Sequence, residues 1–87
     1  MDEIKKRFET ATEEVQSLNK RPDNDTMLKL YALYKQATKG DVSGKRPGMF
    51  DMIGRAKYDA WTAIKGVPEE EAMQQYIDLV EELKRTD

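Results

Sequence analysis

Two lysines and a tyrosine pair have the residue types and spacing to hold an anionic ligand. Tyr31, Tyr34 and Lys35 stand at i, i+3 and i+4, so they are neighbours on the surface of a helix. Lys57 lies within an apolar stripe of a later helical pattern. Lys35 and Lys57 could converge on one anion, to which tyrosine hydroxyls could also donate. Alternatively, the stem of Lys57 extends across the edge of a core and its ammonium group reaches water.

The helix that would carry Tyr31 is apolar over more of its circumference than one packing face needs. Two adjacent stripes are formed by Leu30, Leu33 and Ala37 and by Met27, Leu28 and Tyr31, with Tyr34 between them. Together the stripes span roughly 220°, whereas a single packing face needs about 100°. This pattern predicts that the helix has two neighbours or contacts a ligand that is not protein.

Composition excludes several classes of function. The 87 residues predict one small domain, residues 1–87. The chain has no cysteine and no histidine, so it lacks the commonest general base and the commonest metal ligands. Its 15 bases and 17 acids give a net charge of −2, which disfavours nucleic acid as a partner. We expect no stable membrane insertion and a cytoplasmic location, because no apolar run approaches about 20 residues and no secretory leader is evident.

Hydrophobic periodicity predicts four helices and no strand. The first spans residues 3–19, where apolar residues recur at spacings of four and three. A break containing Pro22 follows, and the second helix ends near Lys39, before Gly40. The third lies between Asp51, its expected N-cap, and Gly66, and the fourth follows Pro68. These elements predict an all-α four-helix bundle.

Two further patterns concern the second half of the chain. Residues 41–51 form a connection that is long for a helix pair, since such loops usually have about 2–8 residues. It could be functional, a plain crossover between helices, or both. The apolar stripe of the third helix is predicted at Ile53, Ala60 and Ile64, with Trp61 at its border. That of the fourth is predicted at Met73, Tyr76, Ile77, Val80 and Leu83, with Ala72 and Leu79 at the border.

The residues favour binding over catalysis. The carboxylates lie mainly on polar faces or at helix starts, and no pair is spaced to share a proton or a metal ion. A ligand with an apolar part for the second helix and an anionic part for the lysines would fit, and a phosphorylated amphiphile has both. A less specific possibility is a basic, amphipathic contact with a membrane surface. A helical module that binds a protein partner is the alternative from another class, and a small thioesterase-like enzyme is the least supported.

A series of motifs identifies the family that the chain resembles. The motifs are YxxYKQAT followed by GD, then RPGMFD, KxDAW and AMxxYI, in that order across nearly the whole chain. They resemble the acyl-CoA-binding protein family. The resemblance implies an up-down-down-up bundle in which the long connection joins helices two and three. It also implies an intracellular carrier and buffer of long-chain acyl-CoA esters, monomeric, without catalytic activity, cofactor or metal ion.

The resemblance also implies roles for individual residues. Tyr31 resembles the tyrosine beside the adenine and ribose phosphate, Lys35 the lysine that meets the 3′-phosphate, and Lys57 the lysine at the nucleotide. Tyr76 resembles the tyrosine that lies against the bound ligand. Four further residues resemble the family positions around the acyl chain and the pocket: Phe8, Ala11, Met27 and Leu28. Tyr34, the surface neighbour of Tyr31 and Lys35, completes the predicted ligand-binding set.

Four positions depart from the family pattern. Gln16 stands where many members have a base, and Lys29 where an apolar residue is common. Tyr58 replaces a frequent second tryptophan, and Val67–Pro68 replaces the usual serine or threonine at the start of helix four. We therefore expect the affinity and the chain-length preference to differ from those of typical members, and the cap of the fourth helix to come from elsewhere.

Overall fold

A computed structural model describes residues 2–87, and these residues form helices and connections with no strand. The helices are α1 (Asp2–Glu14), a 3-10 turn at Val15–Ser17, α2 (Asn24–Lys39), α3 (Met52–Ala63) and α4 (Glu69–Arg85). The predicted all-α class is confirmed. The first helix is shorter than predicted, because its last turn tightens into the 3-10 turn and Leu18 is already extended.

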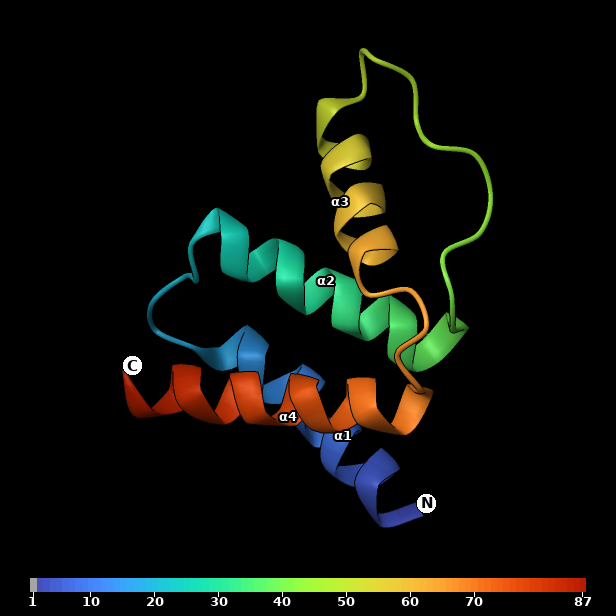
Figure 1. The fold of residues 1–87 in the computed structure, drawn as a ribbon. Helices are drawn as coiled ribbons and strands as arrows, with labels where there is room; N and C mark the ends of the chain where they lie inside the picture. Colours follow the sequence, from blue (N-terminus) through green and yellow to red (C-terminus); the bar gives the residue numbers. More distant parts are fainter. Residues whose placement is uncertain (1) are drawn as a thin grey trace.

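The helices are arranged around the pair α2 and α4. These two run antiparallel in Figure 1, α1 packs against α4, and α3 packs against α2. The ring of Phe8 on α1 also stacks on that of Tyr34 on α2. The predicted four-helix bundle with a long connection between helices two and three is thereby confirmed. α3 rises steeply from the other helices, and the connection arches beside it (Figure 1).

The core is shared by α1, α2 and α4, which we call the core bundle. Its buried side chains are Phe8, Ala11, Leu30, Leu33, Ala37, Ala72, Tyr76, Ile77 and Val80. The stripes predicted for α1 and α4, and the Leu30, Leu33 and Ala37 stripe of α2, therefore point inward as expected. The second stripe predicted for α2 does not belong to this core, since Met27 is exposed and Tyr31 is half-buried. Ala72 was expected at the border of its stripe, but it is fully buried, because a small side chain there lets α4 approach its neighbours closely.

Residues 41–64, the connection and α3, form what we call the α3 lobe. Trp61 is the buried residue of α3 within the described chain. The prediction that Ile53 belongs to a packing stripe is wrong, since 71% of its surface is exposed. The physical reason is that α3 packs against α2 alone, so its first turn extends beyond any neighbour.

Local signals place the helix ends that orient this lobe. The Asp23 carboxylate accepts a hydrogen bond from the Thr26 amide (2.8 Å) and begins α2. The Asp51 carboxylate accepts one from the Gly54 amide (3.0 Å) and begins α3, as predicted. Gly40 ends α2 with a φ of 82°, a left-handed conformation that favours glycine. Pro68 precedes α4 without a side-chain cap, and three glutamates in the first turn favour the positive end of the helix dipole.

Candidate ligand-binding site

Two lysines and two aromatic rings pair reciprocally where α2 meets α3. The Lys57 ammonium group lies 5.2 Å from the centroid of the Tyr31 ring. The Lys35 ammonium group lies 5.1 Å from the centroid of the Trp61 ring. Each helix thus contributes one ring and one lysine, four residues apart. Tyr31 pairs with Lys57, and one turn later Lys35 pairs with Trp61. Helices α2 and α3 therefore run in the same direction, which agrees with an up-down-down-up order.

The positive charge at this contact is not neutralised by a carboxylate within the described residues. The ion pairs found among the described residues join Arg46 to Asp59, and Lys84 to Glu14 and Glu81. Lys57 is exposed and Lys35 is half-buried. The faces of the two rings hold the ammonium groups by cation–π attraction, worth about 0.5–1 kcal/mol at exposed sites. Both lysines therefore keep hydrogen-bond donors for an anion arriving from solvent.

A buried glutamine fixes the position of Trp61. Gln36, with 1% of its surface exposed, donates from Nε2 to Asp41 Oδ1 (2.9 Å) and to the Val67 carbonyl (2.8 Å). The Trp61 indole N–H donates to Gln36 Oε1 (3.1 Å) and to the Gly40 carbonyl (2.9 Å). These bonds tie α2 to the C-terminal end of α3 and to the start of α4.

Asp41 completes this polar cluster. Its Oδ1 also accepts a hydrogen bond from the Gly66 amide (2.7 Å). The hydrogen bonds from Gln36 and from Gly66 lower the pKa of Asp41 below its ordinary value of 3.8. At neutral pH the carboxylate is therefore ionised, and it links the two connections that flank α3.

Our sequence analysis missed Gln36 and placed Trp61 only at the border of a stripe. A signal for Gln36 was present, because it stands three residues after Leu33 and directly before Ala37, on the inward side of α2. A polar residue at such a position must find partners, since an unpaired buried amide is costly. The identity of those partners depends on two chain reversals that helical periodicity does not predict.

A second group of predicted residues forms an aromatic cluster inside the core bundle. The Phe8 ring stacks on Tyr34 with centroids 6.0 Å apart, and meets the Tyr76 ring edge-on at 5.1 Å. Tyr76 is buried, and burial raises the pKa of its phenol above 10, so the hydroxyl stays neutral. Tyr34 remains 44% exposed. It therefore connects the interior cluster to the surface that carries Lys35.

The nine predicted ligand-binding residues thus fall into two sets. Tyr31, Lys35 and Lys57 lie together at the α2–α3 contact, while Met27 and Leu28 lie one turn earlier on α2, exposed and half-buried respectively. Phe8, Ala11 and Tyr76 are almost fully covered core residues, with Tyr34 between the sets.

Two surface hollows lie elsewhere. One, of about 460 Å³, is lined by Glu13, Glu14, Ser17, Leu18, Lys84 and Asp87. The other, of about 510 Å³, is lined by Lys6, Glu9, Thr10, Thr12 and Glu13. Both are shallow and rich in carboxylates or threonine, so neither has the basic and aromatic character of the α2–α3 contact.

Comparison with known proteins places the chain in a family. The sequence model of the family described as Acyl CoA binding protein matches residues 5–80. This chain belongs to that family.

Individual relatives extend the comparison. The chain is 51% identical over 80 residues to an acyl-CoA-binding protein of Gossypium hirsutum, covering 92% of this chain and 90% of the relative. The crystal structure of Oryza sativa Acyl-CoA-Binding Protein 2 superimposes with a TM-score of 0.91 at 42% identity, covering 95% of this chain and 92% of that one. The chain is also 51% identical over 78 residues to enoyl-CoA delta isomerase 2 of Homo sapiens, but it spans only 20% of that protein.

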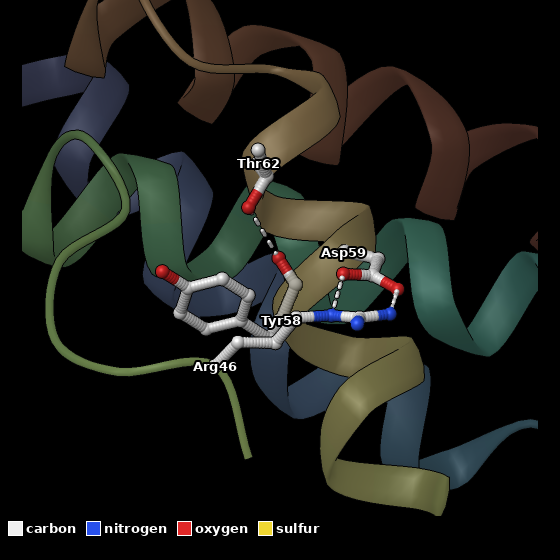
Figure 2. Close-up of polar contacts among 4 residues, drawn as sticks. All are labelled: Arg46, Tyr58, Asp59 and Thr62. Atoms are coloured by element: carbon white, nitrogen blue, oxygen red, sulfur yellow. Dashed lines mark hydrogen bonds and ion pairs between the residues drawn. The ribbon is translucent and has the colours of Figure 1, made fainter. Parts of the chain in front are cut away.

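In this family member, hydrogen bonds made by side chains of the long connection and of α3 hold the connection against α3. The Arg46 guanidinium donates two hydrogen bonds to the Asp59 carboxylate, from Nε to Oδ1 (2.9 Å) and from Nη2 to Oδ2 (2.7 Å), as Figure 2 shows. The Tyr58 hydroxyl donates to the Gly44 carbonyl (2.9 Å). Tyr58, one of the departures from the family pattern, therefore anchors the connection by a hydrogen bond.

Two of the other departures lie at the surface. Gln16 and Lys29 are both exposed. Within the described residues, no group of three or more histidine, cysteine, aspartate or glutamate side chains could hold a metal ion.

Proposed function

We propose that this chain binds long-chain acyl-CoA esters and acts as an intracellular acyl-CoA carrier and buffer. Membership of the acyl CoA binding protein family supports this proposal. The structural observation that carries it is the reciprocal pairing of Lys35 and Lys57 with Trp61 and Tyr31. Two ammonium groups that have no carboxylate partner among the described residues stand beside aromatic rings there, which suits a phosphorylated nucleotide.

In this proposal the two ends of the ligand meet two kinds of surface. Lys35 and Lys57 bind phosphate groups, and Tyr31 lies beside the adenine. The acyl chain lies along Met27 and Leu28 and reaches the side of the Phe8, Tyr34 and Tyr76 cluster, with Ala11 beneath it. Each buried methylene contributes up to about 0.8 kcal/mol, so affinity should rise with acyl length.

The proposal extends to the whole chain. We infer a single acyl-CoA-binding domain, residues 1–87, that is monomeric, cytoplasmic and without catalytic activity. Support for the last point is that no nucleophile with an adjacent base accompanies the lysines in the described residues. The isomerase activity in the name of the human relative is not carried over, because the chain spans only 20% of that protein.

Calorimetric titration with acyl-CoA esters of increasing length tests the proposal. We expect tight binding of palmitoyl-CoA, progressively weaker binding of shorter esters, and poor binding of palmitate, which lacks the nucleotide. Equal affinity for palmitate and palmitoyl-CoA would contradict the role of the lysines. No heat with palmitoyl-CoA at micromolar protein would overturn the carrier function and favour the alternative, a helical module that binds a protein partner.

Substitution of the lysines tests the proposed phosphate contacts. Lys35→Met and Lys57→Met should each weaken palmitoyl-CoA binding by about one to two orders of magnitude, because a charge-assisted hydrogen bond contributes about 1.5–3 kcal/mol. The matched control is Lys39→Met, an exposed lysine in the last turn of the same helix. The Lys35→Met penalty should shrink with a dephospho-CoA ester, which lacks the 3′-phosphate. If both variants bind like wild type at low salt, the lysines do not hold the nucleotide.

A further inference from the structure

The sulfur of this chain is carried by methionine alone. The sequence contains five methionines and no cysteine. Cysteine thiolates and methionine thioethers are the sulfur groups that oxidants attack, and methionine gives a sulfoxide that reductases convert back to the thioether. Because no thiol competes for it, hydrogen peroxide that reaches this chain meets methionine as its sulfur target.

The four methionines of the described residues differ in exposure and in position. Met49 is 70% exposed and Met52 is 77% exposed. Their segment lies at the end of α3 that is remote from the core bundle (Figure 1). Met73 is half-buried and packs against the core, whereas Met27 is 38% exposed in the first turn of α2. Oxidation follows exposure, so a small peroxide reaches Met27, Met49 and Met52 more readily than Met73.

Met27 differs from the two methionines near the start of α3 in what surrounds it. It stands four residues before Tyr31, so the two side chains are neighbours on α2, and the Tyr31 ring lies 5.2 Å from the Lys57 ammonium group. Under the proposed function, the acyl chain lies along Met27 and Leu28. A flexible, polarizable thioether suits such an apolar contact. A sulfoxide oxygen at the same place would lose its hydration to the acyl chain, which is costly unless a hydrogen bond replaces the lost water.

We propose that Met27 is an oxidation site through which hydrogen peroxide lowers the affinity for acyl-CoA, an inference that rests on the proposed function. The Met27 sulfur attacks one peroxide oxygen, so that an S–O bond forms as the O–O bond breaks. The departing hydroxide takes the proton of the transferred oxygen and leaves as water. The thioether is oxidised and the peroxide is reduced by the same electron pair. A bound acyl chain covers the sulfur, so ligand binding and oxidation oppose each other.

Mass spectrometry of tryptic peptides tests where oxygen is added. Trypsin does not cleave before proline, so Met27 falls in the peptide 21–29, Met49 and Met52 fall in 46–55, and Met73 falls in 66–84. In the ligand-free chain, peptides 21–29 and 46–55 should gain oxygen before 66–84 does. Saturating palmitoyl-CoA should slow oxidation of peptide 21–29 at least about fivefold and change that of 46–55 by less than about twofold.

Calorimetry before and after peroxide treatment tests the effect on binding. Wild type should lose palmitoyl-CoA affinity at least about fivefold, and methionine sulfoxide reductase should restore it. Met27→Leu keeps an apolar side chain of similar volume without sulfur, so its own affinity should survive treatment. The matched control, Met49→Leu/Met52→Leu, should lose affinity as wild type does. Circular dichroism of the treated chain should show an unchanged unfolding midpoint.

Three results would overturn the proposal. They are equal losses of affinity for wild type and Met27→Leu, unslowed oxidation of Met27 under saturating palmitoyl-CoA, and unchanged wild-type affinity after Met27 is fully oxidised. The titration of the untreated chain separates this inference from the function on which it rests. If the untreated chain does not bind palmitoyl-CoA, both are wrong. If it binds and oxidation of Met27 leaves the affinity unchanged, only this inference is wrong.

Discussion

In the core bundle, side chains from α1, α2 and α4 bury one another, whereas α3 contributes Trp61 as its buried residue within the described chain. The α3 lobe is held instead by directional polar contacts. Gln36 and Asp41 fix its base, and the Arg46–Asp59 pair and the Tyr58 hydroxyl fix its long connection. Apolar burial is spread over many contacts, while the polar attachment depends on a few atoms. The lobe should therefore loosen under changes that leave the core bundle folded.

This difference locates the candidate site on the border between the two regions. Tyr31 and Lys35 belong to α2, which the core bundle holds, and Lys57 and Trp61 belong to the lobe. The lysine–aromatic pairs thus form only while the lobe keeps its place on α2. Three substitutions compare the two kinds of attachment directly.

The largest effect is expected in the core bundle. Leu33→Ala removes a side chain that is 1% exposed, and creating such a cavity costs about 2–5 kcal/mol of unfolding free energy. Urea denaturation followed by circular dichroism measures the loss. The control is Phe50→Ala, just before α3, where the side chain is 97% exposed, so that the free energy should change by less than about 0.5 kcal/mol. Equal costs for the two substitutions would show that the α3 lobe is as tightly packed as the core bundle.

An intermediate effect, confined to the lobe, is expected at the polar cluster. Gln36→Leu removes the side-chain amide that donates to the Val67 carbonyl and to the Asp41 carboxylate, which should cost about 1–3 kcal/mol. Hydrogen exchange should accelerate in α3 before it does in α1 or α4. The matched control is Gln75→Leu, since the Gln75 amide bonds only the exposed Glu71 carboxylate. Uniform acceleration across all four helices would mean that the lobe does not open separately.

The smallest effect is expected at the ion pair of the long connection. Both side chains are about half exposed, 47% for Arg46 and 51% for Asp59, and exposed pairs contribute about 0–1 kcal/mol. Asp59→Asn should therefore lower the unfolding free energy by no more than about 1 kcal/mol and less at high salt. Its signature should be faster exchange of the amides in residues 42–50. A loss above about 2 kcal/mol would identify the pair as a main attachment of the lobe.

The sequence predicted the core bundle better than the lobe for a physical reason. Leu30, Leu33 and Ala37 recur at helical spacing because α2 buries one continuous face, so periodicity reports their environment directly. Ile53 and Ala60 are separated by the same seven positions as Leu30 and Ala37. Periodicity does not say, however, whether a neighbouring element extends far enough to cover Ile53. The four helices and the Asp51 cap were therefore predicted correctly, while the packing of α3 was not.

The site was predicted in part, for a related reason. The excess apolar arc of α2 and the odd position of Lys57 indicated a ligand surface before the helices were placed. The crosswise partners, Tyr31 with Lys57 and Lys35 with Trp61, depend on the direction and register of α3 against α2. That direction and register follow from the contacts of Gln36 with Trp61 and of Asp41 with Gly66, each of which joins residues 25 positions apart. The roles of the nine site residues remain predictions.

Trp61 is the one tryptophan of the chain, and its surroundings make it a natural optical reporter. Its indole is buried, both hydrogen bonds of its N–H run to α2 or its C-cap, and a cation lies over its face. Emission from this single indole therefore senses the interface at which the lobe meets the core bundle. Any event that draws the Lys35 ammonium group away, or tilts α3, changes the electric field at the ring. Under the proposed acyl-CoA binding, the unlabelled protein should therefore signal its own occupancy.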